Sequence, residues 1–370
     1  MRALVLALSF FACSQVFAWG GRGHDTICRV ASFLVKEDGL KDYLHNKPQM
    51  MGHLCNMPDF YWKSLGGEAN ALGSPAHFID IEVLGLKVQD IPLDYRKIVA
   101  DYTGKPDLFK NDGSTIKSVP TDFGSSWWRA DQFYRMIVDL NKDFAAAKIP
   151  VNFKEEQDND LPYNKLVYQM VVSMGLMGHF VGDNGQPFHT TADYDGWAVG
   201  HGGIHAYFED SVVGQFDGDL DYLVLKESRA MKNPVFLKPK TVVEKMKVLG
   251  GISNAEMAKI LKLDPIKKKS VVVKEHGMSL KTPAEREPAS VAFKKMKPLI
   301  VTEMARSAVL LANLWDESYA AAGKPKLGAY KSYKYPFTVD FVKPDYFDIP
   351  QASPEKLPEK SGEKSPEKAK

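Results

Sequence analysis

Residues 161–189 read LPYNKLVYQMVVSMGLMGHFVGDNGQPFH. Apolar residues recur there every three or four positions, at Leu166, Met170, Met174 and Met177. This spacing places them on one face of an α-helix. Pro187 should break the helix, because proline has no backbone N–H to donate. The stretch therefore predicts a helix over 161–181 with an apolar face, and with histidine and aspartate near its carboxyl end.

The same helical spacing of apolar residues occurs at 24–38 and 127–148. Late in the chain Pro298 stands where it could open another helix. That helix would carry an apolar stripe of Ile300, Met304, Ala308, Leu311 and Trp315. Residues 270–274 show the best strand pattern, and 102–126 are rich in Gly, Pro, Asp and Ser, which predicts a long loop. We expect an all-α fold, a single compact helical domain with a few short strands or hairpins.

Composition excludes several classes of protein. Of the 370 residues, 44% are hydrophobic and 25% are charged, so the whole chain cannot be disordered. The formal net charge of +2 excludes a histone-like polycation, and three cysteines are too few for a cysteine-rich zinc module. After the N-terminus no apolar run approaches the roughly 20 residues that span a bilayer, so we expect a soluble mature protein.

Residues 1–18 have the features of a secretory signal peptide. Arg2 supplies a positive start, residues 3–12 are apolar, and 16–18 (Val-Phe-Ala) form a small-residue cleavage site. Cleavage would leave Trp19 as the first residue of an exported protein, in the periplasm or outside the cell.

Export bears on the two cysteines that remain after cleavage, Cys28 and Cys55. In an oxidising compartment they could form a disulfide. They could equally be two buried free thiols, and the sequence leaves both interpretations open.

Charge is unevenly distributed. Residues 224–300 hold 18 Lys/Arg against 7 Asp/Glu. This excess indicates either a solvated helical surface or a patch for a polyanion or an anionic membrane; aromatic residues are too few there to stack on bases. Residues 351–370 repeat Pro-Glu-Lys and lack large apolar residues apart from Leu357, which predicts a disordered tail.

Two short stretches combine histidine with an acid at helical spacing. His179 and Asp183 are four residues apart, as are His205 and Glu209, so each pair shares a helix face. His189 lies between the pairs. Imidazole and carboxylate are the ligands that zinc takes when no thiolate is available. One such pair is weak evidence for a metal site. Two pairs and a third histidine within about thirty residues predict one.

Two upstream residues are further candidates, each with a structural alternative. His77, in Ala-His-Phe-Ile-Asp, could be a ligand or a hydrogen-bonded core histidine. Asp59 follows Pro58 and could be a ligand, a helix N-cap or a turn residue.

With these residues in place, the chain resembles the trinuclear-zinc nucleases of the nuclease P-one and nuclease S-one type. Their superfamily also contains the zinc-dependent phospholipases C. The opening Trp-Gly-Gly-Arg-Gly-His and the order of candidate ligands carry the resemblance, over about 190 residues. The matching residues are Trp19, His24, Asp59, His77, His179, Asp183, His189, His205 and Glu209. Residues 224–297 have no clear counterpart and are treated as a basic insertion in a domain over 19–350.

The resemblance implies three zinc ions in an all-α fold. One ion would be held by Asp59, His77, His179 and Asp183. A second would be held by His189, His205 and Glu209. The third would be held by the Trp19 amine and carbonyl, His24 and Asp183. A free Trp19 amine requires removal of the signal peptide.

The implied activity is hydrolysis of phosphodiesters by a zinc-activated water that Asp59 orients or deprotonates. The expected substrate is single-stranded DNA or RNA, with no stable protein partner and a monomeric state. The nucleases carry an arginine three residues after the aspartate. Trp62 stands at that place, so Lys63 is the candidate cation, although lysine cannot make a bidentate contact with phosphate.

Other residues do not decide whether the substrate is a nucleic acid or a phospholipid. Phe78 and Asp80 match positions that stack on and hydrogen-bond a base, although Phe78 could also pack in the core. Phe60 could line a base site or a choline site. Glu209 and the 16 residues from His189 to His205 are closer to the phospholipases C. A phospholipase C, or a secreted zinc-binding protein without turnover, therefore remains an alternative.

Overall fold

The computed structural model describes residues 19–275, 278–329 and 338–348. The predicted signal peptide (1–18) and the predicted tail (351–370) lie outside the described residues. The helices are α1 (Gly20–Ser32), α2 (Asp38–Leu44), α3 (Pro48–Met57), α4 (Gly67–Gly73), α5 (Tyr95–Tyr102), α6 (Val119–Phe123), α7 (Ser126–Asp139), α8 (Asn141–Ala146), α9 (Phe153–Gln157), α10 (Pro162–Gly185), α11 (Ile204–Ala206), α12 (Leu220–Ala230), α13 (Val242–Leu263) and α14 (Ala289–Ala321).

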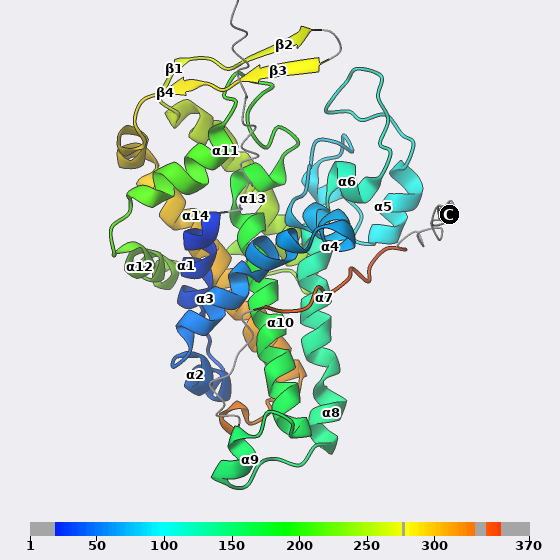
Figure 1. Cartoon of the computed structure of the whole chain (residues 1–370), viewed down its shortest axis with the longest axis vertical. Helices are drawn as coiled ribbons and strands as arrows, with labels where there is room; N and C mark the ends of the chain where they lie inside the picture. The colour runs from blue at the N-terminus through cyan, green and yellow to red at the C-terminus, as the bar shows by residue number, and fades with distance from the viewer. Residues whose placement is uncertain (1–18, 276–277, 330–337, 349–370) are drawn as a thin grey trace, which may run out of the picture.

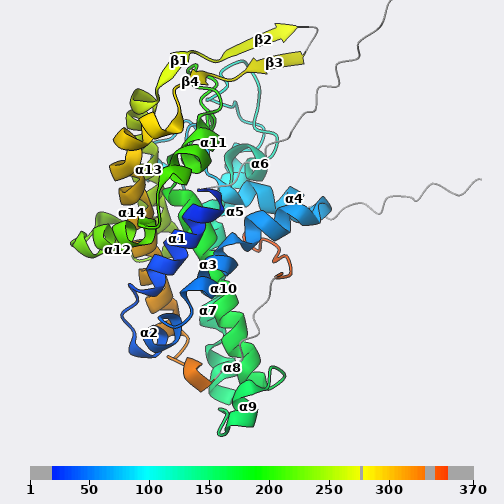
Figure 2. The same ribbon diagram turned by 60° about the vertical axis from the view of Figure 1, so that its left-hand side comes forward.

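The prediction of a mostly helical fold with a few short strands is confirmed (Figure 1). The strands are β1 (Ile266–Lys268), β2 (Val271–Glu275), β3 (Met278–Thr282) and β4 (Glu285–Arg286). They form two antiparallel pairs, β1 with β4 and β2 with β3. The strand predicted at 270–274 corresponds to β2. Figure 2 shows the β2–β3 hairpin extending beyond the helices at one end of the molecule.

Helix α10 is the central element and packs against α1, α3, α7 and α14. Its close packing depends on four glycines at alternating intervals of three and four residues: Gly175, Gly178, Gly182 and Gly185. A side chain at Gly175 would overlap Leu54 of α3, and one at Gly178 would overlap Cys28 of α1. The missing side chains let α1 and α3 lie directly on α10, which places the end of α10 near both helices.

Cys28 of α1 and Cys55 of α3 form a disulfide. This resolves the question that the sequence left open. Both sulfur atoms lie against Gly178 of α10, so the disulfide ties α1 to α3 at the point where both cross the central helix.

Several predicted boundaries are wrong. The helix expected at 24–38 begins earlier and ends at Ser32, and the helix expected at 127–148 is interrupted between α7 and α8. Pro298 does not open α14, which begins at Ala289. The first part of α14 is held by packing, because Ala292 and Met296 are fully buried.

The loop predicted at 102–126 contains the short helix α6 (Val119–Phe123). Pro120 favours the first turn of a helix. The carboxylate of Asp122 accepts hydrogen bonds from the backbone N–H groups of Lys117 and Ser118. These two local effects are enough to form one helical turn within a sequence typical of a loop.

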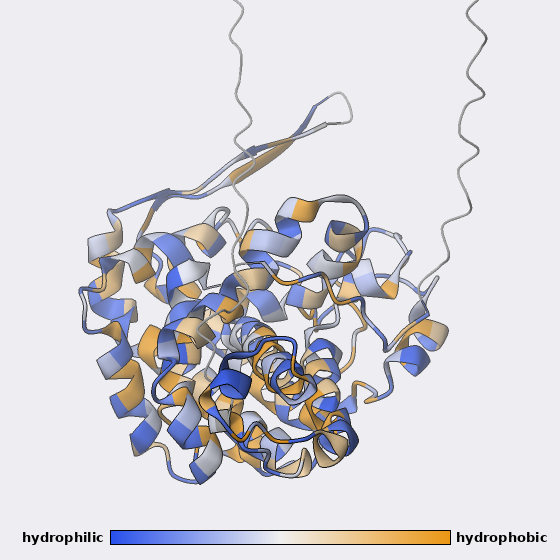
Figure 3. Cartoon of the chain, turned by 60° about the horizontal axis from the view of Figure 1, so that its bottom comes forward, coloured by the Kyte–Doolittle hydropathy of each residue, from blue (hydrophilic) through white to orange (hydrophobic). Residues whose placement is uncertain are grey.

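Among the described residues, none of the helices combines the length and apolar character needed to cross a membrane. Figure 3 shows apolar and polar residues alternating along the helices, the pattern of helices that bury one face. The hairpin differs, because it carries apolar residues while standing apart from the helices.

Candidate metal centre

The structure brings the predicted ligands from six separate segments into one buried cluster. They come from α1, the π-helical turn Pro58–Trp62, the turn that ends at His77, the end of α10, the turn Pro187–Thr190 and the segment around α11. None of these residues is more than 6% exposed. These residues are His24, Asp59, His77, His179, Asp183, His189, His205 and Glu209.

Around the end of α10, four side chains converge. Nδ1 of His77 lies 2.9 Å from Nε2 of His179 and 3.1 Å from Oδ2 of Asp183. Oδ1 of Asp59 is 3.6 Å from Nδ1 of His77 and 3.7 Å from Nε2 of His179. His77, His179 and Asp183 form one of three groups in the described residues that could hold a metal ion.

A second group consists of His189, His205 and Glu209. Nε2 of His205 lies 3.0 Å from Nε2 of His189 and 2.9 Å from Oε2 of Glu209. The backbone N–H of Trp19 donates to the same Oε2 at 3.1 Å. Trp19 is therefore beside this group, with its indole N–H bonded to the carbonyl of Gly182.

His24 joins the cluster from α1. Its ring stacks on that of His179 with 4.1 Å between centroids, and its Nε2 is 3.3 Å from Oδ1 of Asp183. The third group that could hold a metal comprises His24, Asp59 and His179. Asp183 thus lies between His24 on one side and His77 on the other.

Backbone carbonyls orient two of the histidine rings. Nδ1 of His179 is 2.7 Å from the carbonyl of Cys55, and Nδ1 of His189 is 2.7 Å from the carbonyl of His77. A carbonyl only accepts, so each Nδ1 carries the proton and each Nε2 presents a lone pair to the cluster. Metal-binding histidines are typically held in this way.

The donor set fits a metal ion. Zinc–nitrogen bonds of 2.0–2.1 Å imply about 3.3 Å between neighbouring ligand atoms of a tetrahedral site, which matches the contacts given above. Burial lowers the pKa of His77, His179 and His189 well below the usual histidine value, so they are neutral. Neutral imidazole is the form that binds metal.

The carboxylates of the cluster need positive charge to remain ionised. Burial, followed by the nearby Asp59, raises the pKa of Asp183 well above its usual value. Burial also raises the pKa of Glu209. A cation between these groups reverses such shifts because it favours the charged carboxylate. The cluster therefore has the donor atoms and the buried surroundings that could hold a metal ion.

The predicted catalytic cation, Lys63, points into the cluster. Its ammonium group is 2.5 Å from Oδ1 of Asp59. Trp62 is instead 2% exposed and lies against Phe133 and Phe341. The reason is the π-helical turn Pro58–Trp62, which takes about one residue more per turn than an α-helix and rotates Trp62 away from Asp59.

The predicted substrate-binding residues lie at different depths. Phe60 is 51% exposed and covers Gly21. Phe78 and Asp80 are half-buried, on the segment that follows His77. The backbone N–H of Ile79 donates to the carbonyl of His189 at 2.9 Å, which fixes this segment to the second metal-binding group. Burial, with Glu82 nearby, raises the pKa of Asp80 well above its usual value.

Two supporting residues were missed in the sequence. The side-chain amide of Gln186 donates to Oε2 of Glu209 at 2.9 Å. The carboxylate of Asp195 accepts from the backbone N–H of His205 at 3.1 Å and from the indole of Trp197 at 2.7 Å. Gln186 lies between Asp183 and His189 in the sequence, but spacing alone does not indicate what a glutamine contacts.

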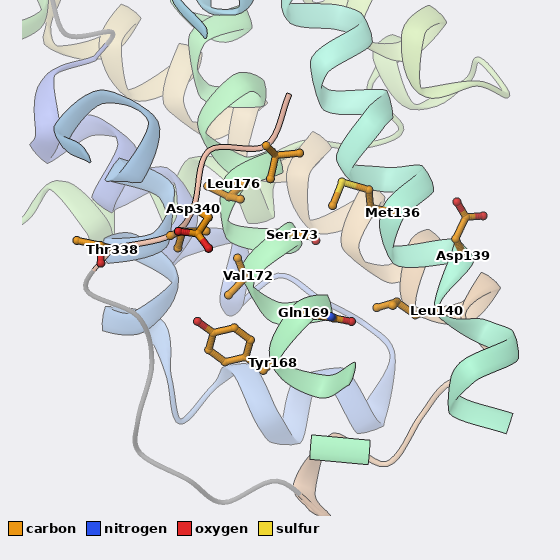
Figure 4. A pocket seen from close by; sticks show the side chains of 12 residues that line it. Met136, Asp139, Leu140, Tyr168, Gln169, Val172, Ser173, Leu176, Thr338 and Asp340 are labelled. Atoms are coloured by element: carbon orange, nitrogen blue, oxygen red, sulfur yellow. The ribbon is translucent and has the colours of Figure 1, made fainter. Parts of the chain in front are cut away.

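His201 is not part of the cluster. Its Nδ1 lies 2.8 Å from Oδ2 of Asp264, which also pairs with Arg286. His201 therefore anchors the loop between His189 and His205 to Asp264. A separate pocket of about 580 Å³ lies between α7, α10 and residues 338–342 (Figure 4). None of its lining side chains belongs to the metal-binding groups.

Comparison with known proteins gives no match: neither a protein-family model nor a curated protein aligns with this chain.

Proposed function

We propose that the protein is a zinc-dependent phosphodiesterase, with single-stranded DNA or RNA as its substrate. The observation that carries the proposal is the convergence of three metal-binding groups with Lys63 and Asp59 in direct contact. Several close metals and one cation suit an anionic phosphodiester, whose charge grows during displacement.

Three zinc ions are proposed, on the ligand sets that the resemblance implies. Asp59, His77, His179 and Asp183 would hold one ion. His189, His205 and Glu209 would hold another. Trp19, His24 and Asp183 would hold the third. When bound, zinc supplies Lewis-acid polarisation and activates water for attack at neutral pH.

The remaining roles fall to side chains of this chain. Asp59 would orient or deprotonate the attacking water, as the resemblance implies; its Oδ1 lies 3.6 and 3.7 Å from two ligand histidines and contacts Lys63. The Lys63 ammonium group would neutralise a non-bridging phosphate oxygen. Phe78 would stack on a base, which gives weak sequence preference because every base has a π-face.

We also propose that the protein is exported. The Cys28–Cys55 disulfide is compatible with an oxidising compartment. Mass spectrometry of protein secreted from cells that express the full chain tests this: a mature N-terminus at Trp19 supports export, and a retained Met1 contradicts it.

A side-by-side hydrolysis assay tests the activity. Zinc-loaded protein is offered single-stranded nucleic acid and phosphatidylcholine, with and without chelator. Nucleic-acid cleavage that the chelator abolishes supports the proposal. Lipid cleavage alone identifies a phospholipase C instead, the alternative to which Glu209 and its spacing point.

The Asp59→Asn variant separates an enzyme from a binding protein. Turnover should be lost while most of the zinc content, measured by elemental analysis, is kept. A wild-type protein that holds three zinc ions and cleaves neither substrate contradicts the nuclease proposal.

A further inference from the structure

The β2–β3 hairpin, residues 271–275 and 278–282, has two different faces. Side chains alternate along each strand, and Val273 pairs across the hairpin with Leu280. Val271, Val273 and Leu280 therefore share one face, each about half exposed at 45%, 49% and 51%. The other face carries Val272, Lys274 and Lys281.

The second face contacts the rest of the molecule through Lys281, while Val272 (41% exposed) and Lys274 on the same face remain exposed. Lys281 lies over the ring of Trp197, with its ammonium group 5.0 Å from the ring centroid. Because side chains alternate, Val271, Val273 and Leu280 point away from the rest of the molecule. Figures 2 and 3 show the hairpin standing clear of the helices.

The hairpin is also basic. Residues 266–286 contain six Lys/Arg and two Asp/Glu. Lys268, Lys269 and Lys274 are exposed along its length. Long lysine side chains can extend from an apolar face to reach the phosphates of a membrane surface.

We propose that the apolar face of the hairpin docks on an anionic phospholipid surface. Aliphatic side chains flanked by lysines are the chemistry of a peripheral membrane site, where apolar burial and attraction to anionic lipid add together. Nucleic acid is disfavoured as the occupant, since the described residues of the hairpin include no aromatic ring to stack on bases.

The proposal is independent of the catalytic one, because docking needs neither metal nor hydrolysis. The test is therefore co-sedimentation with vesicles in the presence of chelator. One set of vesicles is pure phosphatidylcholine, and the other is an equal mixture with phosphatidylglycerol. We expect binding to the mixture, weakened by salt, and little binding to phosphatidylcholine.

Variants identify the face. Val273→Ser with Leu280→Ser should weaken binding by about tenfold or more, and Lys274→Gln by about fivefold. Val272→Ser is the matched control, because the same change on the opposite face should have little effect. Val151→Ser with Phe153→Ser is a second control, since these side chains are 72% and 74% exposed at the far end of the molecule.

Three results would overturn the proposal. One is equal binding of the Val273/Leu280 and Val272 variants to the mixed vesicles. Another is no vesicle binding by the wild type while the Lys274 variant loses affinity for a single-stranded oligonucleotide, which would assign the hairpin to nucleic acid. The third is a change in sedimentation velocity without vesicle binding, which would assign the face to a second copy of the chain.

Discussion

The ammonium group of Lys63 lies 2.5 Å from Oδ1 of Asp59, one turn along the same helical segment. Under the proposed function this pair places a cation beside the group that accepts a proton. We expect Lys63→Met to lower kcat/KM by about 10²-fold, the usual cost of removing one donor to the developing charge. Lys63→Arg should restore part of this activity because it keeps the charge. Zinc content should be unchanged in both variants.

Trp62 provides the control for this prediction. Its indole N–H donates to the carbonyl of Val339 at 2.7 Å and its ring packs in the core. Trp62→Phe should lower the melting temperature and leave kcat/KM almost unchanged. If Trp62→Phe and Lys63→Met reduce kcat/KM equally, the cation role of Lys63 is wrong.

Gly182 leaves the space in which His24 lies. A Cβ at this position would be 2.8 Å from Nδ1 of His24, so the ring would have to move. We expect Gly182→Ala to weaken zinc binding by about 10- to 100-fold, measured by competition with a fluorescent chelator. Gly214→Ala is the control, because nothing lies within 4 Å of its added methyl group. Unchanged zinc affinity in Gly182→Ala would show that His24 is not a ligand.

The disulfide makes a separate prediction for stability. Cys28 and Cys55 are 27 residues apart, and closing a loop of this length stabilises a fold by about 3–4 kcal/mol. Denaturant unfolding with and without reductant measures this difference. The Cys28→Ser, Cys55→Ser double variant should have the same unfolding free energy as the reduced wild type, and reductant should not change it. An unfolding midpoint that reductant leaves unchanged would contradict the expectation.

Glu303 predicts a pH dependence of stability. It is buried in α14 beside Arg306, with Glu256 and Lys259 of α13 also acting on it, and burial raises its pKa from 4.5 to about 8. The protonated Glu303 therefore contributes its full stabilisation of the fold below the unfolded-state pKa of 4.5. This stabilisation is lost as the pH rises through the folded-state pKa of about 8.

Glu303→Gln cannot ionise, so it should gain stability relative to the wild type between about pH 5 and pH 9, by up to about 4 kcal/mol. Urea unfolding at both pH values measures the gain. The exposed Glu285→Gln variant should show none. Parallel pH curves for Glu303→Gln and the wild type would refute the raised pKa.

The apolar periodicity of 161–181 was sufficient to predict α10, because a helix with this spacing buries one face whatever its neighbours are. The pairs His179–Asp183 and His205–Glu209 were predicted from a different pattern, the four-residue spacing that puts a histidine and an acid on one helix face. Their convergence was not predictable from spacing. It depends on the glycines of α10: Gly175, Gly178 and Gly182 leave room for α1 and α3, and Gly185 leaves room for Ser307 of α14.

Other errors arose where packing or local geometry overrides the pattern. Pro298 lies inside α14 because buried neighbours on the preceding turns hold the helix together. The π-helical turn at Pro58–Trp62 has no signature in a count of residues. The sequence named Lys63 as the candidate cation only because it stands next to Trp62, and the π-helical turn supplies the geometric reason that Lys63 rather than Trp62 contacts Asp59.

The loop between His189 and His205 connects the metal-binding cluster to the β2–β3 hairpin. Its Gly200 and Gly202 carbonyls accept hydrogen bonds from Ser270 and Ala284, at the base of the hairpin. Its two ends are histidines of one metal-binding group. If a surface bound at the hairpin changes the metal affinity through this loop, the coupling is reciprocal. Bound metal must then change the affinity of the hairpin for that surface by the same factor.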